Sequence, residues 1–373
     1  MTNSLPKRVW ILCSDKGGDN AQIEIVMQRL GWRTNPAFQV ETRKLIFKPR
    51  YQFGKPPFFA SLYHVDQNRS DALKPPWPDL ILTVGRRPAM AALWVKKQSE
   101  KASPGAGSRL SRIVLFGRPK RWMRAFDLII APVQYQLPPN HNLLTIGLPL
   151  MRVDSEAVAK ARAEWQAEFA ELGHPLVAVM VGGSTKPYVL NRQSTRNLIE
   201  AAVKALPEGG TLYFSTSRRT PQEAIETLKQ CLPPDARLYE WKAGGEKNPY
   251  LALMGSADEI IVTGDSVSMM TEAVRLQRRL LIFPLPKGQP SWLDNANLLL
   301  RSSGEIPTRR LEKLAVKLGL VSYARNLEAI HQWLYRHRLA APLGEQAPLP
   351  EAFADDDLER VAARLNQMVS TED

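Results

Sequence analysis

The sequence predicts an α/β protein built on two doubly wound parallel sheets, and three observations point to this class. Strand and helix patterns alternate along most of the chain, as they do in parallel sheets whose strands are joined by helices. The 373 residues, 44% of them hydrophobic, are enough for two domains with apolar cores. Polar or glycine-containing turns follow most of the strands, at the edge where such sheets hold their ligands.

The first half, residues 1–150, predicts one domain. Its strands are short apolar runs, at Val9–Cys13, Phe38–Lys44, Asp79–Val84, Arg112–Phe116 and Leu128–Ala131. We expect helices at Asn20–Leu30 and at Pro88–Lys97, the second with a proline near its start. A loop is expected at Ser14–Asp19, and the many prolines and aromatics of residues 48–78 predict irregular surface structure.

The second half, residues 151–325, repeats the pattern and predicts a second domain. Its strands are expected at Leu176–Val181, Thr211–Ser215, Arg237–Trp241, Glu259–Thr263 and Leu280–Pro284. Its helices are expected at Ser155–Leu172, Ser194–Leu206, Pro221–Leu232 with Thr220 as cap, Pro249–Met254 and Ser266–Arg275. Residues 326–373 predict helices that pack back across the domains, with a proline-rich break at 342–350.

The excess positive charge lies entirely in the first half. Residues 1–150 hold 23 Lys and Arg against 9 Asp and Glu, whereas the remaining 223 residues hold 27 against 28. A basic domain suits an anionic partner such as a membrane surface, an acidic acceptor or nucleic acid. A generally basic surface that aids solubility is the alternative. Nucleic acid is disfavoured because the half has no known binding motif or aromatic platform.

Cysteine usage and hydropathy indicate where the chain works. Cys13 and Cys231 lie far apart in apolar segments, so we expect buried thiols, with no disulfide framework and no metal-ligand spacing. No apolar run is long enough to span a bilayer, and the first ten residues lack the apolar core of a signal peptide. We therefore expect the protein in the cytoplasm or on the inner face of a membrane.

Four polar loops of the second half follow predicted strands and are expected to meet at one edge of the sheet. Their candidate ligand-binding residues are Gly182, Gly183, Ser184, Thr185 and Lys186; Ser217, Arg218 and Arg219; Trp241; and Asp265, Ser266, Val267, Ser268 and Met269. Glycines, hydroxyls and helix N-termini suit a diphosphate, and Glu272 can accept hydrogen bonds from a ribose or sugar diol. Tight turns, helix caps and a core tryptophan explain each loop separately. Their recurrence at one edge favours a nucleotide-diphosphate ligand.

The first half has two corresponding loops. The first contains Asp15, Lys16, Gly17, Gly18, Asp19 and Asn20, and it lacks the GxGxxG pattern of NAD sites. Asp19 or Asp15 is a candidate general base toward an acceptor hydroxyl, although Asp19 equally suits a helix cap. Lys16 can pair with an anion. Arg86 and Arg87 follow the third strand, and such a pair suits phosphate or carboxylate recognition or a solvated surface.

Several of these motifs resemble a known family. SDKGGDNAQ, TVGRR, IGLPL, GGSTK, FSTSRRT and SADEIIVTGDSVSMMTEA are similar to the mitochondrial fission ELM (elongated mitochondria) family, over most of residues 8–300. The second half also looks like the donor domain of GT-B glycosyltransferases, such as the lipid-linked N-acetylglucosaminyltransferase of peptidoglycan synthesis. That resemblance implies two facing Rossmann-like domains. It places Asp265, Ser266 and Ser268 against a diphosphate and Glu272 at the ribose, while Lys16–Asp19 corresponds to an acceptor-domain loop, here without its usual histidine.

The residues and the resemblance together predict a function. We expect an inverting, metal-independent glycosyltransferase that moves a sugar from a nucleotide-diphosphate sugar to an anionic or lipid-linked acceptor of the cell envelope. No separate cofactor is expected, because the nucleotide-diphosphate sugar is the co-substrate. The basic first domain would meet the acceptor, at the membrane surface if the acceptor is a lipid. The alternative is a non-catalytic scaffold or adaptor that has kept this fold.

Overall fold

The chain forms two compact units. The computed structural model describes residues 5–14, 17–52, 60–102, 110–119, 123–185, 187–245, 247–288, 326–349 and 356–370. The first unit contains the described residues up to Met151 together with helix α12 (Asp357–Ser370). The second contains those from Arg152 onward together with α11 (Leu327–Arg336) and β12 (Ala341–Pro342). The C-terminal helices are therefore divided between the two units.

The first unit is built on a six-stranded parallel sheet. Its strands are β1 (Lys7–Cys13), β2 (Phe38–Lys44), β3 (Leu80–Val84), β4 (Arg112–Phe116), β5 (Leu128–Pro132) and β6 (Leu143–Ile146). They lie in the order β2-β1-β3-β4-β5-β6. The strand order reverses between β1 and β3, so the loops after these two strands flank the switch point at which doubly wound sheets bind ligands.

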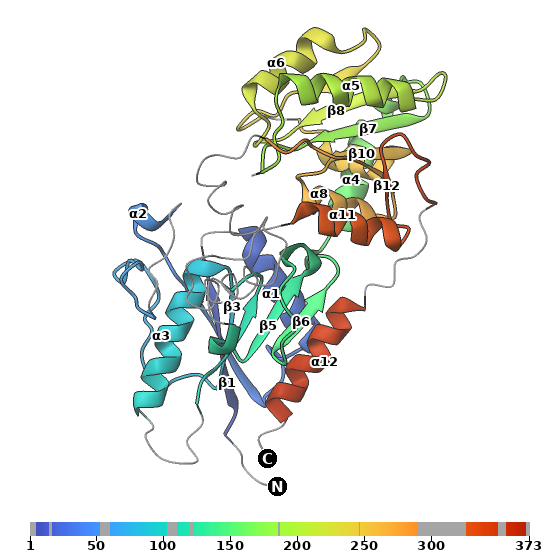
Figure 1. Cartoon of the computed structure of the whole chain (residues 1–373). Helices are drawn as coiled ribbons and strands as arrows, with labels where there is room; N and C mark the ends of the chain where they lie inside the picture. Colours follow the sequence, from blue (N-terminus) through green and yellow to red (C-terminus); the bar gives the residue numbers. More distant parts are fainter. Residues whose placement is uncertain are drawn as a thin grey trace, which may run out of the picture. The chain divides into compact units, whose positions relative to one another are not determined.

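Helices cover both faces of this sheet. Its helical segments are α1 (Gly17–Leu30), α2 (Pro49–Gln52), α3 (Arg86–Ala102), η1 (Met123–Ala125) and η2 (Val133–Tyr135). Helices α1 and α12 pack on one face through Ile23 and Leu365, and α3 packs on the other through Val95 (Figure 1). Trp10 and Ile11 of β1 are both buried, one in each of these layers. A strand buried on both faces has no polar side, which is why these strands read as apolar runs.

Helix α12 is fastened to the first unit along its length. The backbone N–H of Gly147 donates to the Asp357 carboxylate at 2.6 Å. Further along, Glu359 pairs with Arg29 of α1, and Asn366 accepts a hydrogen bond from the Trp32 indole. Helix α12 therefore lies beside α1 and completes the layer that covers this face of the sheet.

The second unit repeats the parallel design with a different strand order. Its remaining strands are β7 (Leu176–Val181), β8 (Thr211–Thr216), β9 (Arg237–Tyr239), β10 (Glu259–Thr263) and β11 (Arg279–Phe283). The order is β12-β11-β10-β7-β8-β9, with all neighbours parallel. Numbered from β7, this is the Rossmann order 3-2-1-4-5-6, and its switch point lies between β7 and β10.

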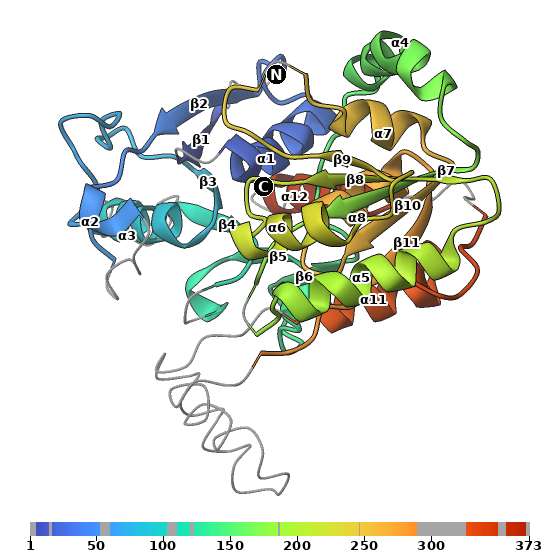
Figure 2. The same ribbon diagram turned by 90° about the horizontal axis from the view of Figure 1, so that it is seen from above.

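Helices sandwich this second sheet as well. They are α4 (Ser155–Ala170), α5 (Arg192–Ala205), α6 (Gln222–Cys231), α7 (Tyr250–Ser256) and α8 (Val267–Arg275), besides α11. Figure 1 shows α5 and α6 on one face of the sheet and α8 and α11 on the other, and Figure 2 looks down on α5 and α6. The prediction of an α/β protein with two Rossmann-like domains is confirmed.

Some details differ from the expectations. Helix α1 begins at Gly17 rather than Asn20, although two glycines weaken a helix at its start. Helix α3 begins at Arg86, which places its proline in the first turn, where no intrahelical N–H bond is needed. Thr220 does not cap α6, because its hydroxyl instead donates to the carbonyl oxygens of Val181 and Gly182.

Two other expectations concern the cysteines and the membrane. The expectation of two buried thiols is wrong for Cys231, which is exposed at the end of α6, while Cys13 is half-buried in β1. Burial raises the pKa of the Cys13 thiol. Within the described ranges, no helix is both long and apolar enough to cross a bilayer.

Candidate functional site

Two neighbouring loops of the second unit are tied together at its switch point. The backbone N–H of Gly182, directly after β7, donates to the Thr263 hydroxyl of β10 at 2.8 Å, and that hydroxyl donates to Asp265 Oδ1 at 2.8 Å. The N–H of Gly183 donates to Asp265 Oδ2 at 2.9 Å. The loop after β7 is therefore held against the loop after β10 by a short chain of hydrogen bonds.

The first two residues of the loop after β7, Gly182 and Gly183, must be glycine. A Cβ on Gly182 would lie 2.4 Å from Asp265 Oδ1, and a Cβ on Gly183 would lie 2.3 Å from the carbonyl oxygen of Arg219. The sequence suggested glycines that let backbone approach a phosphate. In the structure these glycines also let three loops approach one another.

Asp265 is the centre of this arrangement. Its side chain is fully buried, and besides the two bonds above it receives Arg219 Nη2 at 3.1 Å. Burial raises the pKa of Asp265, while the hydrogen bonds from Gly183 and Thr263 and the charge of Arg219 oppose that rise. Its two oxygens are occupied by groups of the protein, so the carboxylate positions the loops and the guanidinium.

Arg219 is the cation of the site. It comes from the loop after β8, and its side chain is 45% exposed. Its Nη1 also donates to the Thr185 hydroxyl at 3.3 Å, so it joins the loops after β7, β8 and β10. A guanidinium has five N–H groups, and donors therefore remain for an anionic ligand beside the exposed face of Arg219.

Helix α8 begins next to Asp265. Its cap, Ser266, is buried, and the Ser266 side chain makes no capping hydrogen bond. The N–H groups of Val267, Ser268 and Met269 precede the first intrahelical bond, from Met270 N to Ser266 O, so they have no partner within the helix. Ser268 is exposed there. This N-terminus offers donors and a positive dipole end to an anion.

Glu272 lies further along α8 and has a partner that the sequence did not suggest. The Tyr250 hydroxyl, from the first residue of α7, donates to Glu272 Oε2 at 2.6 Å. Burial raises the pKa of Glu272, and the bond from Tyr250 opposes the rise. Burial and the adjacent carboxylate also raise the pKa of Tyr250. The pair leaves Glu272 Oε1 as the oxygen with which a diol could bond.

The other predicted residues of this edge have mixed environments. Ser217 donates to the carbonyl oxygen of Gly182 at 3.2 Å, and Ser184 accepts from Leu190 N–H at 3.0 Å. Arg218 is exposed. Trp241 is half-buried, and its backbone N–H donates to the Thr216 hydroxyl at 2.8 Å. Lys186 lies outside the described residues.

His331 is a second residue of the site without a signal in the sequence. Its Nε2–H donates to the carbonyl oxygen of Gly264 at 2.8 Å, and a Cβ on Gly264 would lie 2.7 Å from His331 Cε1. The ring is buried, which lowers the pKa of His331. A residue of α11 therefore supports the loop that carries Asp265.

The first unit places its corresponding loops differently. Asn20 closes the turn after β1, because its side chain accepts from Ser14 N–H at 3.2 Å and donates to Ser14 O at 2.8 Å. Gly17, Gly18 and Asp19 are described only as backbone of the first turn of α1. Asp15 and Lys16 lie outside the described residues.

The two arginines after β3 separate into an exposed and a buried side chain. Arg86 is exposed, whereas Arg87 is 8% exposed. The Arg87 guanidinium lies 4.5 Å above the Phe47 ring, and its Nη1 donates to the carbonyl oxygen of Tyr51 at 3.5 Å. Arg86 is thus the one of the two that faces a possible ligand.

Groups of metal-ligating side chains and surface hollows are two further marks of a functional site. The described ranges contain no group of three or more His, Cys, Asp or Glu side chains that could hold a metal ion. Two shallow hollows of about 450 and 420 Å³ lie beside α4 and beside β12, and neither is lined by the residues around Asp265. The candidate site is therefore described from its hydrogen bonds and charges.

Sequence comparisons identify related proteins. Residues 17–309 match the model of the family described as Mitochondrial fission ELM1. The mitochondrial fission protein ELM1 of Arabidopsis thaliana is 27% identical over an alignment of 184 residues, with 43% of each chain covered. The match thus spans less than half of the length of that relative. The uncharacterized protein RP120 of Rickettsia prowazekii (strain Madrid E) is 24% identical over 320 residues, covering 74% of this chain and 83% of that protein.

Solved structures were compared with the whole chain. A putative UDP-N-acetylglucosamine 2-epimerase from Listeria monocytogenes aligns with a TM-score of 0.49 and 11% identity, covering 99% of this chain and 98% of that one. The catalytic domain of starch synthase IV from Arabidopsis thaliana, bound to ADP and acarbose, aligns with a TM-score of 0.48 and 10% identity, covering 99% of both chains.

Proposed function

The chain belongs to the mitochondrial fission ELM1 family, and we propose that it is a GT-B-like glycosyltransferase that uses a nucleotide-diphosphate sugar. One observation carries this proposal. At the switch point of the second unit, a buried carboxylate holds a half-exposed arginine beside a helix N-terminus whose serine side chain makes no capping bond. This is a prearranged set of donors of the kind that binds a diphosphate.

The donor would bind through three groups of the second unit. Arg219 would donate its remaining N–H groups to the diphosphate, and the first turn of α8 would donate backbone N–H groups. Glu272, held by Tyr250, would accept from the ribose or sugar diol. Fixed donors beside a leaving diphosphate stabilise the charge that develops on it, so the reaction as we propose it is metal-independent and needs no cofactor.

The acceptor side of the proposal rests on the first unit. Asp19 and Asp15, in the loop after β1, are our candidates for the base that removes the proton of the acceptor hydroxyl, in an inverting transfer. The basic character of residues 1–150 supports an anionic or lipid-linked acceptor, and Arg86 is its exposed cation next to β3. A cytoplasmic enzyme working at the inner membrane would meet a cell-envelope acceptor of this kind.

One observation favours a second candidate, a scaffold or adaptor without turnover. Asp265 places a carboxylate in the proposed diphosphate site and already takes one bond from Arg219, as expected of a site that no longer needs a ligand. The family and the Arabidopsis relative are named for mitochondrial fission. An adaptor would keep the fold and lose nucleotide binding.

Thermal unfolding with nucleotides separates the two candidates. A ligand that binds only the folded protein raises the unfolding temperature. At a free ligand concentration [L], it adds RT ln(1 + [L]/Kd) to the free energy of unfolding. We expect UDP or another nucleoside diphosphate at millimolar concentration to raise it. Arg219→Ala should weaken that binding about tenfold or more, because a charge-assisted hydrogen bond contributes about 1.5–3 kcal/mol. Arg196→Ala, at an exposed arginine of α5 that is not a candidate for ligand binding, is the matched control.

The contrary outcomes are equally defined. No shift with any of the nucleoside diphosphates would exclude the transferase and leave the adaptor. A shift that Glu272→Ala leaves unchanged would show that the ribose is bound elsewhere. Turnover is then tested with a mixture of nucleotide-sugars. An added phosphatase that cleaves the released nucleoside diphosphate frees inorganic phosphate, which is measured.

A further inference from the structure

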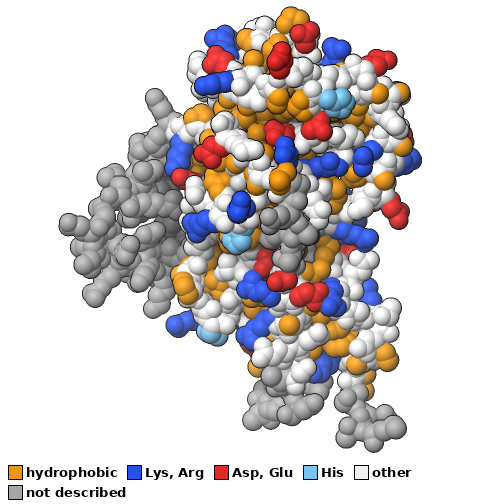
Figure 3. Space-filling view, turned by 90° about the vertical axis from the view of Figure 1, so that its right-hand side faces the viewer, with side chains coloured by type: hydrophobic (Ala, Val, Ile, Leu, Met, Phe, Trp, Pro, Cys, Tyr) orange, Lys and Arg blue, Asp and Glu red, His pale blue; other side chains and the backbone are white. Residues whose placement is uncertain are grey.

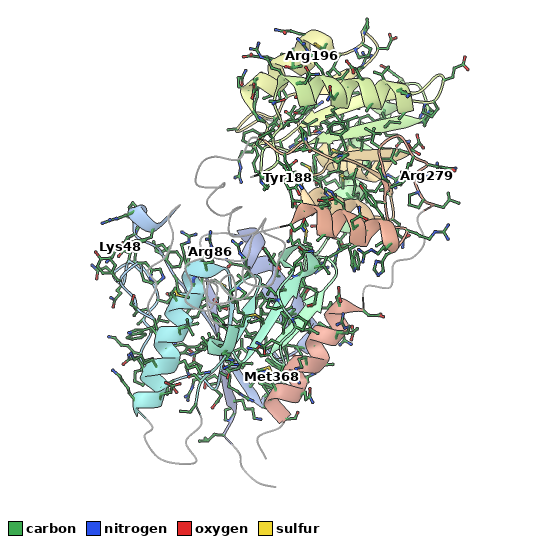
Figure 4. The ribbon with its side chains drawn as sticks, in the orientation of Figure 1. Lys48, Arg86, Tyr188, Arg196, Arg279 and Met368 are labelled. Carbon is green, nitrogen blue, oxygen red and sulfur yellow. The ribbon has the colours of Figure 1, made fainter. Side chains whose placement is uncertain are left out.

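The first unit carries a small group of exposed basic and aromatic side chains near the switch point of its sheet. This group, which we call the basic rim, consists of Lys48, Arg50, Tyr63 and Arg86. All four are exposed, and the side chain of Tyr63 is 62% exposed. Figure 4 labels Lys48 near α2 and Arg86 where α3 begins, at the same end of the unit.

The rim is held in place by a buried platform. The His64 ring is fully buried and stacks on Phe47 with 5.4 Å between the ring centres. The guanidinium of Arg87 also lies over the Phe47 ring. His64 Nε2–H donates to the carbonyl oxygen of Arg87 at 2.9 Å, and Lys48 N–H donates to the carbonyl oxygen of His64 at 3.1 Å. One chain of hydrogen bonds therefore connects the backbone of Lys48 with the residue next to Arg86.

The aromatic and cationic side chains of the rim also contact one another. Lys48 Nζ lies 4.8 Å above the Tyr63 ring, and Tyr51 meets that ring edge-on with 6.0 Å between centres. A tyrosine with its ring in this position presents an apolar body and a polar tip, which is the combination favoured at a membrane–water interface. A lysine beside it adds attraction to anionic headgroups.

The charge of the rim is of one sign. Within the described ranges, Lys48, Arg50 and Arg86 form no ion pair, whereas elsewhere cations such as Arg29 and Lys96 are paired with carboxylates. On the side of the molecule that carries α11 and α12, acidic and basic side chains are interspersed (Figure 3). An unpaired basic patch with an exposed aromatic residue is complementary to an anionic surface.

We propose that the basic rim is the surface by which the first unit docks on an anionic lipid membrane. The cations face the headgroup phosphates, and the Tyr63 ring enters the interfacial layer. This deepens the proposed function, which places the acceptor at a membrane, by naming the residues that make the contact. The rim lies in the other unit from the donor site, so its test does not depend on nucleotide binding.

Vesicle sedimentation tests the proposal on the full chain. Vesicles of phosphatidylcholine are compared with vesicles of equal parts phosphatidylcholine and phosphatidylglycerol. We expect sedimentation with the second only, and release at about 1 M salt, where the Debye length falls to about 3 Å. Failure to bind either vesicle at low salt overturns the proposal.

Charge-reversal variants locate the contact. Each basic residue near an anionic membrane contributes about fivefold to binding, so Lys48→Glu with Arg86→Glu should weaken it at least about 25-fold. Tyr63→Ser should weaken it less, and Arg50→Glu gives a single-site variant if the double variant is unstable. Arg196→Glu with Lys204→Glu on α5 makes the same change of net charge and should leave binding intact. An equal loss with both double variants would show attraction by net charge alone and overturn the rim.

Two further arms identify the source of the anion. Rim-dependent stabilisation by inorganic phosphate without vesicle binding would assign the rim to a small anion. Rim-dependent binding of duplex DNA without vesicle binding would assign it to nucleic acid, and either result overturns membrane docking. The UDP thermal shift measured on the same proteins reports on the donor site, so a failed donor site and a failed rim are separate results.

Discussion

Each of the two sheets has a switch point at which its strand order reverses, and the side chains at the two switch points differ. In the second unit, the loops after β7, β8 and β10 are joined through one buried carboxylate, Asp265, and its partners. In the first unit, Asn20 closes the loop after β1 on itself, and Arg86 after β3 extends from the surface. A parallel sheet determines where a site lies. The side chains decide whether that place is a rigid, hydrogen-bonded site, as in the second unit, or an exposed charged edge, as in the first.

The largest expected effect is the loss of stability on removal of the Asp265 carboxylate. Asp265→Ala leaves the Gly183 N–H, the Thr263 hydroxyl and Arg219 without their acceptor, and we expect a loss of about 3–5 kcal/mol in the free energy of unfolding. Asn20→Ala removes the two bonds that close the first loop and should lose about 1–2 kcal/mol. Urea unfolding of both variants measures the difference. Equal losses of stability in the two variants would contradict the contrast between a rigid site in the second unit and an exposed edge in the first.

The second prediction concerns two adjacent arginines. Arg87→Ala removes a buried guanidinium that packs on Phe47 and donates to the Tyr51 carbonyl, and it should destabilise the protein by about 1–2 kcal/mol. Arg86→Ala, one residue away, should change stability by no more than about 0.5 kcal/mol. The readout is the midpoint of urea unfolding. If Arg86→Ala were the more destabilising, the exposed edge would have a structural role that the structure does not assign to it.

The smallest prediction is a gain of stability. Burial raises the pKa of Glu272 above its ordinary value of 4.5. The contribution of Glu272 to the free energy of unfolding is therefore fully present below the pKa that Glu272 has in the unfolded chain. It is lost as the pH rises through the higher pKa of the folded protein. Glu272→Gln should remove this dependence and raise the unfolding temperature slightly at neutral pH, in the absence of nucleotide. Thermal unfolding as a function of pH, with wild type and Tyr250→Phe alongside, provides the measurement.

Tyr250→Phe sharpens the same test. The hydrogen bond from Tyr250 lowers the pKa of Glu272, so its removal should raise that pKa further. The loss of stability with rising pH should then occur at higher pH than in wild type. A pH profile identical to that of wild type would mean that the Tyr250–Glu272 bond does not influence the carboxylate.

The strands were predictable because each is a short apolar run between polar turns. The predicted and observed bounds agree at both ends for β2, β4, β7 and β10, and within a few residues for the other expected strands. No bounds were predicted for strands β6 and β12. Helix starts were less predictable. At α1 the glycines indicated a loop, yet the helix already begins at Gly17. At α6 a threonine indicated a cap, yet the Thr220 hydroxyl bonds to carbonyl oxygens of the loop after β7 and its strand.

The inner partners of the site could not be predicted. Tyr250 and Glu272 are 22 residues apart, and His331 and Gly264 are 67 apart, with no spacing pattern that connects either pair. The sequence identified Asp265 as a polar residue at a helix N-terminus, but its burial follows from three loops that converge only in the folded sheet. The difference in exposure between Arg86 and Arg87 likewise depends on Phe47, over which the Arg87 guanidinium lies.

The fastening of α12 to the first unit has a consequence for the order of synthesis. The sheet of that unit is complete when Ile146 has been made, but its α1 face is covered only when Val361 and Leu365 have been added. Roughly 200 residues separate the two events, about 10–40 s at ~5–20 residues per second on the ribosome. During that interval the residues of the second unit are made and can fold, while the first unit keeps an apolar layer open. The nascent chain is therefore most exposed to chaperones and aggregation on its oldest domain.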